Sequence, residues 1–218
     1  MFKIRSVETI GILFAIFSYL SFSLLDTIQK TLIIYYSVFQ LLFIKYSFIL
    51  FLSLFESWRK KNIKFYYTYN LKIQILKSLL SIIESGCFVL AFRYMSLADT
   101  HSIGASAPII VVILAAIFLK EKVTIEIWVL IFIGFIGVLI IMRPGLTVFD
   151  YNSLFALSGA FFVGLYQIII RKISAKDKNE TSLFYSGLSG VIFMGCISIF
   201  YWKPIILNFL ILFLGMGF

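Results

Sequence analysis

The stretch Met95–Gly145 reads MSLADTHSIGASAPIIVVILAAIFLKEKVTIEIWVLIFIGFIGVLIIMRPG. It holds two apolar runs of about 20 residues, the length that an α-helix needs to cross roughly 30 Å of hydrocarbon. The runs meet at a charged corner, Lys120-Glu121-Lys122, and Pro108 interrupts the first run behind the small residues Gly104 to Ala107. Proline inside a helix removes a backbone hydrogen bond and bends the helix. The stretch therefore predicts a transmembrane helical hairpin with a kinked first arm.

The composition of the whole chain agrees with a membrane protein. Hydrophobic residues make up 61% of the 218 residues and charged residues 13%, whereas soluble domains have about 25% charged residues. The net charge of +9 could suit nucleic acid, but the basic residues lie in short loops between apolar runs. Topology control and attraction to anionic lipid explain such loops better. We therefore expect a multi-pass protein of the cell (inner) membrane, with the lipid bilayer and not nucleic acid as its partner.

Seven complete spans can be marked along the chain, followed by an incomplete eighth. The spans are 8–28, 34–55, 73–94, 98–119, 124–142, 152–171 and 181–202. The eighth begins near Ile205, and about 14 residues at 1.5 Å each are too few to cross the bilayer. The expected fold is an all-α helical bundle, and we expect the sequence to be a fragment that stops in mid-span.

The basic residues predict the orientation of these spans. Thirteen Lys and Arg residues fall in loops on one side, namely Lys3, Arg5, Arg59, Lys60, Lys61, Lys64, Lys72, Lys120, Lys122, Arg171, Lys172, Lys176 and Lys178. Only four fall on the other side, namely Lys30, Arg93, Arg143 and Lys203. Cytoplasmic loops carry the excess of Lys and Arg. The N-terminus is therefore expected in the cytoplasm.

An internal repeat links the first span to the sixth. Leu13-Phe14-Ala15-Ile16 recurs as Leu154-Phe155-Ala156-Leu157, and Lys30 meets Arg171 at the same offset of 141 residues. Five spans separate the copies, so the second copy would enter the membrane from the opposite side. This arrangement is an inverted-topology repeat, which is typical of many secondary transporters.

Five short motifs occur in order within Met95–Gly145. They are Ser96-Leu97-Ala98-Asp99, Pro108, Leu119-Lys120-Glu121-Lys122, Gly134-Phe135-Ile136-Gly137-Val138-Leu139 and Arg143-Pro144-Gly145. Their order resembles the fourth and fifth helices of EamA-type transporters in the drug/metabolite transporter superfamily. The resemblance implies five plus five helices with a substrate cavity between the halves. Residues 1–145 would form the first repeat and residues 151–218 an incomplete second one.

Ionisable residues inside spans mark the candidate site, because such groups are expensive in a bilayer and are therefore suspect as functional. Glu84 lies half-way through the third span and is a candidate proton- or substrate-binding carboxylate. The alternative is a structural ion pair with Lys77, seven residues earlier, or with Lys45 in the second span. Members of the resembling family often carry a basic residue near the place of Lys45, which makes it a second candidate for contact with the substrate.

Further polar residues extend the candidate site. Asp26 closes the first span, and its repeat counterpart is Gln167, beside Tyr166; these could line the cavity wall, or Asp26 could only cap its helix. Pro108 and Ser106 lie where bending of the fourth helix would free backbone carbonyls, which a ligand, Ser106 itself or water could then satisfy.

A possible outer gate lies between the third and fourth spans. Arg93, Asp99 and His101 could form a pH-sensing gate there, although a solvated loop is the plainer interpretation. His101 is the sole histidine of the sequence, which excludes a metal site built on imidazoles, and we expect neither metal nor cofactor.

Three functions fit these observations to different degrees. The first is a secondary transporter of a small organic metabolite (amino-acid-, S-adenosylmethionine-, vitamin- or drug-like) that works by alternating access. The wording of the motifs looks closest to uptake members for adenosyl or flavin compounds. The second is a membrane assembly or channel subunit without transport of its own, and a homodimer also remains open. The third, a membrane-embedded lipid-modifying enzyme, lacks the Asp-rich or HExxH-type runs it would need, so we expect no enzyme.

Overall fold

A computed structural model of the chain describes residues 2–61, 64–120, 124–142, 151–174 and 177–216. Within these ranges all regular elements are helices, which confirms the all-α prediction. In chain order they are α1 (Phe2–Leu32), α2 (Val38–Arg59), α3 (Leu71–Tyr94), α4 (Leu97–Gly104), α5 (Ala107–Leu114), η1 (Ala115–Leu119), α6 (Ile125–Met142), α7 (Ser153–Ser174), α8 (Asn179–Ser198), η2 (Ile199–Tyr201), η3 (Leu207–Phe209) and α9 (Leu210–Gly215).

Six helical stretches are long and apolar enough to cross a membrane. They are Thr9–Leu32, Val38–Arg59, Leu71–Tyr94, Leu97–Leu119, Ser153–Ile173 and Asn179–Tyr201. These six correspond to six of the seven complete spans expected from the sequence, so the chain is a multi-pass membrane protein. Helix α6 occupies the remaining one, the expected span 124–142, but only Ile125–Gly137 qualifies there, as a shorter apolar helix. The span at 124–142 and the partial eighth span remain predictions, and Glu121, Lys122 and the motif at 143–145 lie outside the described residues.

Short polar caps decide where several helices begin. Ser37 precedes α2 and accepts a hydrogen bond from the Gln40 backbone N–H at 3.2 Å. Asn70 does the same for α3 through the N–H of Ile73, also at 3.2 Å. Such caps satisfy one of the backbone donors that a helix start leaves unpaired, and each contributes about 1 kcal/mol. The helix starts are therefore encoded locally.

The fourth span is interrupted where the sequence places its small residues. Helix α4 ends at Gly104 and α5 begins at Ala107, with Pro108 in the first turn of α5. Proline is tolerated there because its missing N–H would have no partner in a first helical turn. Pro108 therefore begins a new helix, whereas the sequence had predicted a bend within a continuous one.

The tightest helix packing joins α2 to α8. A Cβ atom added to Gly190 would lie 2.1 Å from Cγ of Tyr46, and one added to Gly187 would lie 2.7 Å from the backbone of Leu50. Both glycines are buried. Small residues let the backbones of two membrane helices approach closely, so α2 and α8 form a close-fitting pair.

Helix α7 packs against α3 on one side and α5 on another. The ring of Phe88 on α3 covers Gly159, where an added Cβ would lie 2.9 Å from the ring. The side chain of Ile110 on α5 packs against Gly164 in the same way, and an added Cβ there would lie 2.9 Å from Cγ2 of Ile110. Glycines on α7 thus position α3 and α5 on either side of the helix that begins the second predicted repeat.

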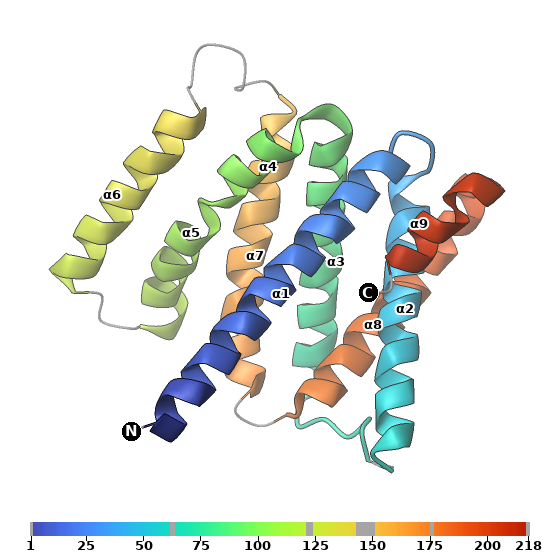
Figure 1. Cartoon of the computed structure of the whole chain (residues 1–218), viewed down its shortest axis with the longest axis horizontal. Coiled ribbons are helices and arrows are strands. Elements are labelled where there is room, and N and C mark those ends of the chain that lie inside the picture. The colour runs from blue at the N-terminus through green and yellow to red at the C-terminus, as the bar shows by residue number, and fades with distance from the viewer. Residues whose placement is uncertain (1, 62–63, 121–123, 143–150, 175–176, 217–218) are drawn as a thin grey trace.

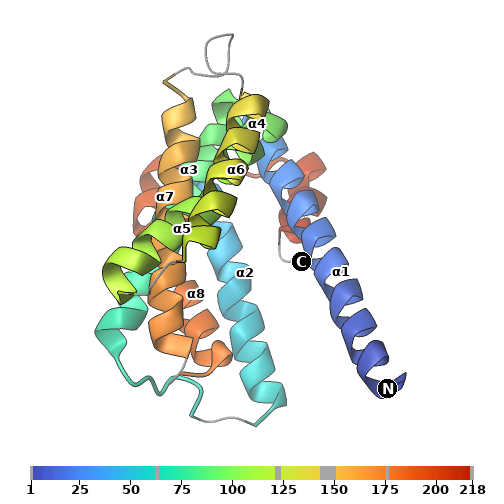
Figure 2. The same ribbon diagram turned by 90° about the vertical axis from the view of Figure 1, so that its left-hand side faces the viewer.

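Helix α1 lies apart from this bundle over much of its length. Figure 2 shows α1 diverging from α2 and α3 toward the N-terminus. No residue in the most apolar part of the span Thr9–Leu32 is buried within the described structure. Its C-terminal end returns to the bundle, where Leu32 and Ile33 are fully buried. Lys30 fixes this end by donating to the carbonyls of Phe92 and, at 2.6 Å, Met95.

The segments that connect the helices discussed below lie at two ends of the molecule (Figure 1). The N-terminus of α1, the α2–α3 loop and the α7–α8 loop lie at one end, here named the basic end. The α1–α2 and α3–α4 turns lie at the other, and α1 and α7 run in opposite directions between them. The grouping agrees with the loop assignment made from Lys and Arg; which end faces the cytoplasm stays a prediction.

Candidate functional site

A cavity of about 310 Å³ lies between α1, α2, α3, α4, α5 and α7, in the half of the bundle away from the basic end. We name it the charged cavity. Its polar lining comes from Asp26, Gln29, Lys45, Glu84, Ser85 and His101. Its apolar lining comes from Phe22, Leu25, Phe88, Phe92, Gly104, Ala107 and Val163. Its volume lies near the lower limit of the range typical of small-molecule sites, about 300–1,000 Å³.

Glu84 contributes a half-buried carboxylate to the charged cavity from the middle of α3. Within the described part of the chain, no direct ion pair or hydrogen bond ties it to a neighbour. It does interact electrostatically with Lys45, which attracts it, and with Asp26, which repels it. The structural ion pair considered from the sequence is therefore a longer-range attraction, which leaves the carboxylate oxygens accessible to a ligand or proton.

Lys45 faces Glu84 from α2. Its Nζ donates to the hydroxyl of Ser85 at 3.1 Å and lies 5.9 Å from the centroid of the Tyr46 ring. A lysine ammonium has three donors, so further donors remain for a ligand. Tyr46 is in turn held by Ser81, whose Oγ lies 3.1 Å from the tyrosine hydroxyl.

Asp26 and His101 connect α1 to α4 across the cavity. Asp26 Oδ2 lies 3.2 Å from His101 Nε2. The imidazole is 54% exposed, so the charged cavity reaches the surface there. The sequence left two alternatives for Asp26, a place in the cavity wall or a role only as a helix cap. The structure places Asp26 in the lining of the charged cavity. His101 contacts Asp26 and the Phe92 ring, 5.8 Å away between centroids.

The other members of the expected gate lie elsewhere. Asp99 accepts a hydrogen bond from the Ser96 hydroxyl at 2.6 Å, and the Asp99 N–H donates back to that oxygen at 3.1 Å. This reciprocal pair caps α4. Arg93 is exposed and lies over the ring of Tyr94 at 5.9 Å. The structure thus brings only His101 to the charged cavity.

Lys77 lies on the far side of Glu84, toward the basic end. It is 1% exposed and donates to the backbone carbonyl of Ser182 at 2.6 Å. With Tyr166 it lines a separate cavity of about 80 Å³. Tyr166 also interacts electrostatically with Glu84. These two predicted residues therefore lie between the charged cavity and the basic end, and Lys77 is not the ion-pair partner of Glu84.

The remaining predicted residues differ in burial. Gln167 is exposed on α7 and is absent from the lining of the charged cavity, to which α7 contributes Val163. Pro108 is exposed, and Ser106 is buried between the cavity-lining Gly104 and Ala107. The Ser106 hydroxyl has no hydrogen-bond partner among the described residues.

A polar network closes the basic end. Asp177, in the α7–α8 loop, accepts hydrogen bonds from Thr68 Oγ1 at 2.5 Å, from the Tyr69 N–H at 2.8 Å and from Gln74 Nε2 at 2.8 Å. We name these four residues the Asp177 network. Burial alone would raise the pKa of Asp177, but the three hydrogen bonds and the nearby Lys77 charge outweigh it and lower that pKa. The carboxylate is therefore ionised, and the contact formed, at neutral pH.

Further contacts strengthen the same end. Lys60 bridges Glu56 at 2.8 Å and Glu180 at 2.7 Å. These hydrogen-bonded carboxylates raise the pKa of Lys60. The Tyr185 hydroxyl donates to the carbonyl of Tyr66 at 2.8 Å. Contacts between the α2–α3 loop and α8 thus join these segments at the basic end.

Sequence reasoning missed Gln29 and the Asp177 network. Gln29 follows Asp26 by three residues, which places both on one face of α1, so a polar pair in an apolar span could have signalled it. Asp177 gave no signal, because its partners, in the α2–α3 loop and at the start of α3, lie more than 100 residues away in the chain.

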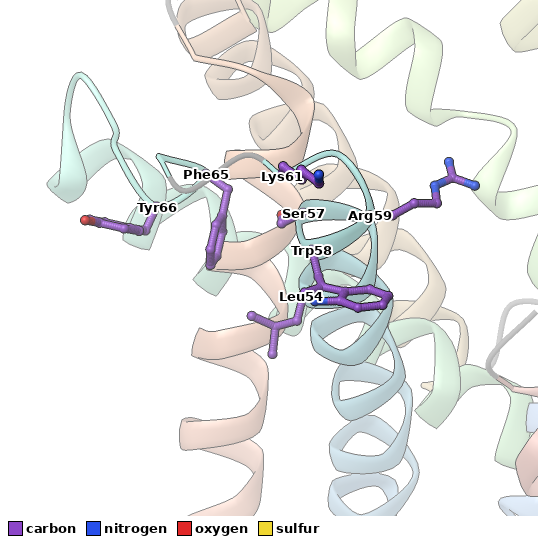
Figure 3. A pocket seen from close by; sticks show the side chains of 7 residues that line it. All are labelled: Leu54, Ser57, Trp58, Arg59, Lys61, Phe65 and Tyr66. Carbon is purple, nitrogen blue, oxygen red and sulfur yellow. The ribbon is translucent and has the colours of Figure 1, made fainter.

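A larger cavity, of about 940 Å³, lies at the basic end near the end of α2. Leu54, Trp58, Phe65 and Tyr66 dominate its lining, and Figure 3 shows Arg59 pointing away from Phe65 and Tyr66. None of the residues that line the charged cavity lines this one. Its aromatic and basic lining is typical of a membrane interface.

Comparison with known proteins bears on the identity of the chain. The model of the EamA-like transporter family matches residues 9–143, which is more than half of the sequence. The riboflavin transporter of Vibrio cholerae is 34% identical over 80 residues, covering 37% of this chain and 27% of the relative. The S-adenosylmethionine uptake transporter of Rickettsia bellii is 27% identical over 116 residues, covering 53% of this chain and 40% of the relative.

A third relative is an exporter. The pseudopaline exporter of Pseudomonas aeruginosa is 25% identical over 116 residues, covering 51% of this chain and 39% of the relative. The matched part of the chain thus spans less than half of the length of each of these relatives. The family and the names of the relatives point to a transporter and not to an enzyme. The chain belongs to the EamA-like transporter family.

Proposed function

We propose that this protein is a secondary active transporter of a small organic metabolite, working by alternating access. The observation that carries the proposal is the charged cavity, in which Glu84, Lys45 and Asp26 meet within membrane-spanning helices. Charges at that depth are expensive and face a bundle interior or a wet cavity. A cavity that gathers three of them is a candidate site for a polar cargo.

The two ends of the bundle support alternating access. The charged cavity reaches the surface beside His101, whereas the Asp177 network and the Lys60 ion pairs seal the basic end. If the basic end faces the cytoplasm, as the Lys and Arg distribution predicts, the structure corresponds to an outward-facing state. Transport would then require the basic end to open while α1 closes over the cavity.

Helix packing supports an inverted repeat as the basis of that motion. Helices α1 and α7 run in opposite directions (Figure 1), as expected for the first helices of inverted repeats. Helix α2 packs against its proposed counterpart α8, and the contact of α3 with α7 has a counterpart in that of α9 with α1. This pattern is what an approximate twofold axis in the membrane plane would produce.

The relatives suggest the cargo. Riboflavin and S-adenosylmethionine are named for two uptake proteins and pseudopaline for an exporter. An S-adenosylmethionine-like or vitamin-like metabolite is therefore the class to try first, with uptake as the first direction. The assignment of Glu84 as the coupling or substrate-binding group belongs to the same proposal.

Uptake into proteoliposomes tests this function. Radiolabelled S-adenosylmethionine and riboflavin are offered with and without an imposed proton gradient, and wild type is compared with Glu84→Gln. Removal of a charge that binds substrate or proton costs about 1.5–3 kcal/mol, so we expect uptake to fall at least about tenfold. Glu126→Gln is the matched control, because Glu126 is exposed in the first turn of α6 and does not line the charged cavity.

Two results would count against the proposal. Unchanged uptake and unchanged pH dependence in Glu84→Gln would remove the role of that carboxylate. No saturable uptake of either compound, or of a wider metabolite panel, would instead favour the second candidate, a non-transporting assembly or channel subunit. Native mass spectrometry of the purified protein would then show whether it binds another membrane chain or a second copy.

A further inference from the structure

Gln29 is a buried polar side chain whose amide nitrogen has no partner in the described part of the chain. It is 3% exposed, lines the charged cavity, and its Nε2 has no hydrogen-bond acceptor among the described residues. An unpaired buried donor costs about 1–3 kcal/mol. Native proteins usually pair such groups with protein, water or a ligand. The Gln29 amide therefore points to an acceptor that occupies the cavity.

Another buried glutamine shows what a purely structural role looks like. Gln40 is fully buried, its Nε2 donates to the carbonyl of Lys203 at 2.8 Å, and its Oε1 accepts from the Lys203 N–H at 3.1 Å. Both halves of that amide are thus satisfied by the backbone of a single residue. Gln29 has no such arrangement for its donor.

The charges that face the cavity from each helix do not cancel. Glu84 on α3 and Asp26 on α1 are negative, Lys45 on α2 is positive, and His101 on α4 is positive only when protonated. The lining from α5 and α7, Ala107 and Val163, carries no charge. With neutral His101 one negative charge remains, and a buried uncompensated carboxylate needs a cation or a proton.

We propose that the charged cavity binds a zwitterionic ligand, with its carboxylate on the Gln29 amide and Lys45 and its cationic group on Glu84 and Asp26. This inference rests on the proposed transport function and narrows its cargo. It makes Gln29 a ligand-binding residue. It also disfavours neutral cargo, which would leave the second carboxylate of the cavity without a cationic partner.

Such a ligand would draw together the least firmly packed helix and the bundle. Gln29 and Asp26 belong to α1, whereas Lys45 and Glu84 belong to α2 and α3. Helix α1 buries little of its own span. A ligand that bridges these groups would supply contacts that α1 otherwise lacks, so its binding would favour closure of α1 over the cavity.

Equilibrium binding to the purified chain in nanodiscs tests the inference without any gradient. The probes form pairs that share one scaffold and differ in the zwitterionic part. S-Adenosylmethionine is compared with 5′-methylthioadenosine, and lysine with cadaverine, which lacks only the carboxylate. Riboflavin serves as the neutral probe. We expect at least one zwitterion to bind about tenfold or more tightly than its partner, since a charged hydrogen bond is worth about 1.5–3 kcal/mol.

Variants of Gln29 then assign the carboxylate contact. Gln29→Leu should remove most of that preference, and Gln29→Glu, which adds a second negative charge, should weaken the zwitterion further. 5′-Methylthioadenosine should bind both variants as it binds wild type, whereas the dication cadaverine should bind Gln29→Leu as it binds wild type and Gln29→Glu more tightly. Thr27→Val is the control, because Thr27 is exposed on the same helix and bonds only its own backbone at Ser23. Comparing probes on one variant removes effects of altered folding.

The outcomes separate this inference from the transport proposal. Binding of riboflavin alone, equal binding within each pair, binding of no zwitterion, or equal loss for both members of a pair in Gln29→Leu would each overturn it. Uptake of riboflavin alone would keep the transporter and reject the zwitterion site. Zwitterion binding with no uptake would keep the zwitterion site and reject the transporter.

Discussion

The two halves of the bundle differ in how they are held together. Near the basic end, the Asp177 network and the Lys60 ion pairs join the α2–α3 loop to the start of α8. In the other half, the pair of Asp26 with His101 joins α1 to α4, and Lys30 holds the end of α1 to α3. Several polar bonds join segments at the basic end, whereas within the described residues fewer tie α1 to the helices around the charged cavity.

The difference indicates which contacts a transport cycle would have to break. Polar contacts in the loops can be exchanged for water at little net cost, because each contributes only about 0.5–1.5 kcal/mol. The glycine contacts between α2 and α8 are apolar and close-fitting, and packed interfaces of this kind do not deform gradually. We therefore expect the ends of the bundle to move while the α2–α8 pair stays together.

Breaking the α2–α8 pair should have the largest effect. Gly190→Ala adds a Cβ that would lie 2.1 Å from the Tyr46 ring, so one helix must shift. Overpacking of this kind costs about 1–3 kcal/mol or more. We expect a lower melting temperature and less monodisperse protein in detergent. Gly134→Ala on α6, where no atom lies within 4 Å of an added Cβ, should behave as wild type; equal behaviour of the two would contradict the proposed packing.

Loosening the Asp177 network should have the next largest effect, confined to the basic end. Asp177→Asn keeps the shape but removes the charge that accepts from Thr68, Tyr69 and Gln74. Weakening these bonds should cost about 1–3 kcal/mol. We expect amide hydrogen exchange in residues 66–74 to accelerate about tenfold or more, with residues 23–30 of α1 unchanged. Uniform acceleration across the chain would show that the network stabilises the whole fold and not one end.

Acidity offers a second way to disturb the same network. Because the folded-state pKa of Asp177 lies below the ordinary value of 3.8, the contact is fully formed above that value and is lost as pH falls through the lower folded pKa. Exchange at the basic end, corrected for its intrinsic pH dependence, should therefore be constant between about pH 5 and pH 8. A loss of protection within that range would contradict the lowered pKa.

Removing the Asp26–His101 contact should have a smaller effect in the cavity half. His101→Gln deletes a 3.2 Å pair whose imidazole is 54% exposed, and exposed pairs contribute at most about 1 kcal/mol. Exchange in residues 23–30 should rise by no more than about fivefold. Arg93→Gln, at the edge of α3, should not reproduce the change. If it does, Arg93 belongs to the gate that the sequence predicted.

Gln167→Leu should have the smallest effect. Gln167 is exposed on α7, and exposed substitutions usually change stability by less than about 0.5 kcal/mol. We expect wild-type melting and wild-type uptake. A clear loss of uptake would instead support the pseudo-symmetric pairing of Asp26 with Gln167 that the repeat suggested.

Sequence reasoning reached some of the site because polar residues in apolar spans are conspicuous. Glu84, Lys45 and Asp26 stood out against their surroundings, and the structure places all three on one cavity. Lys77 stood out equally, yet it faces Ser182 on α8. Spacing along α3 could not tell that Glu84 lines the cavity while Lys77 does not. The two residues are seven positions apart and share one face of α3, but different helices pack against that face at the two levels.

The sequence by itself determined that the chain is helical, crosses the membrane repeatedly and belongs to its transporter family. Apolar run length and short motifs are local properties, so they can be read before the chain folds. Only the tertiary structure decided that the Gln29 amide nitrogen lacks a partner among the described residues, that His101 faces Asp26 and that Asp177 binds the α2–α3 loop. Each of these depends on how segments far apart in the chain pack together, and no local pattern records that packing.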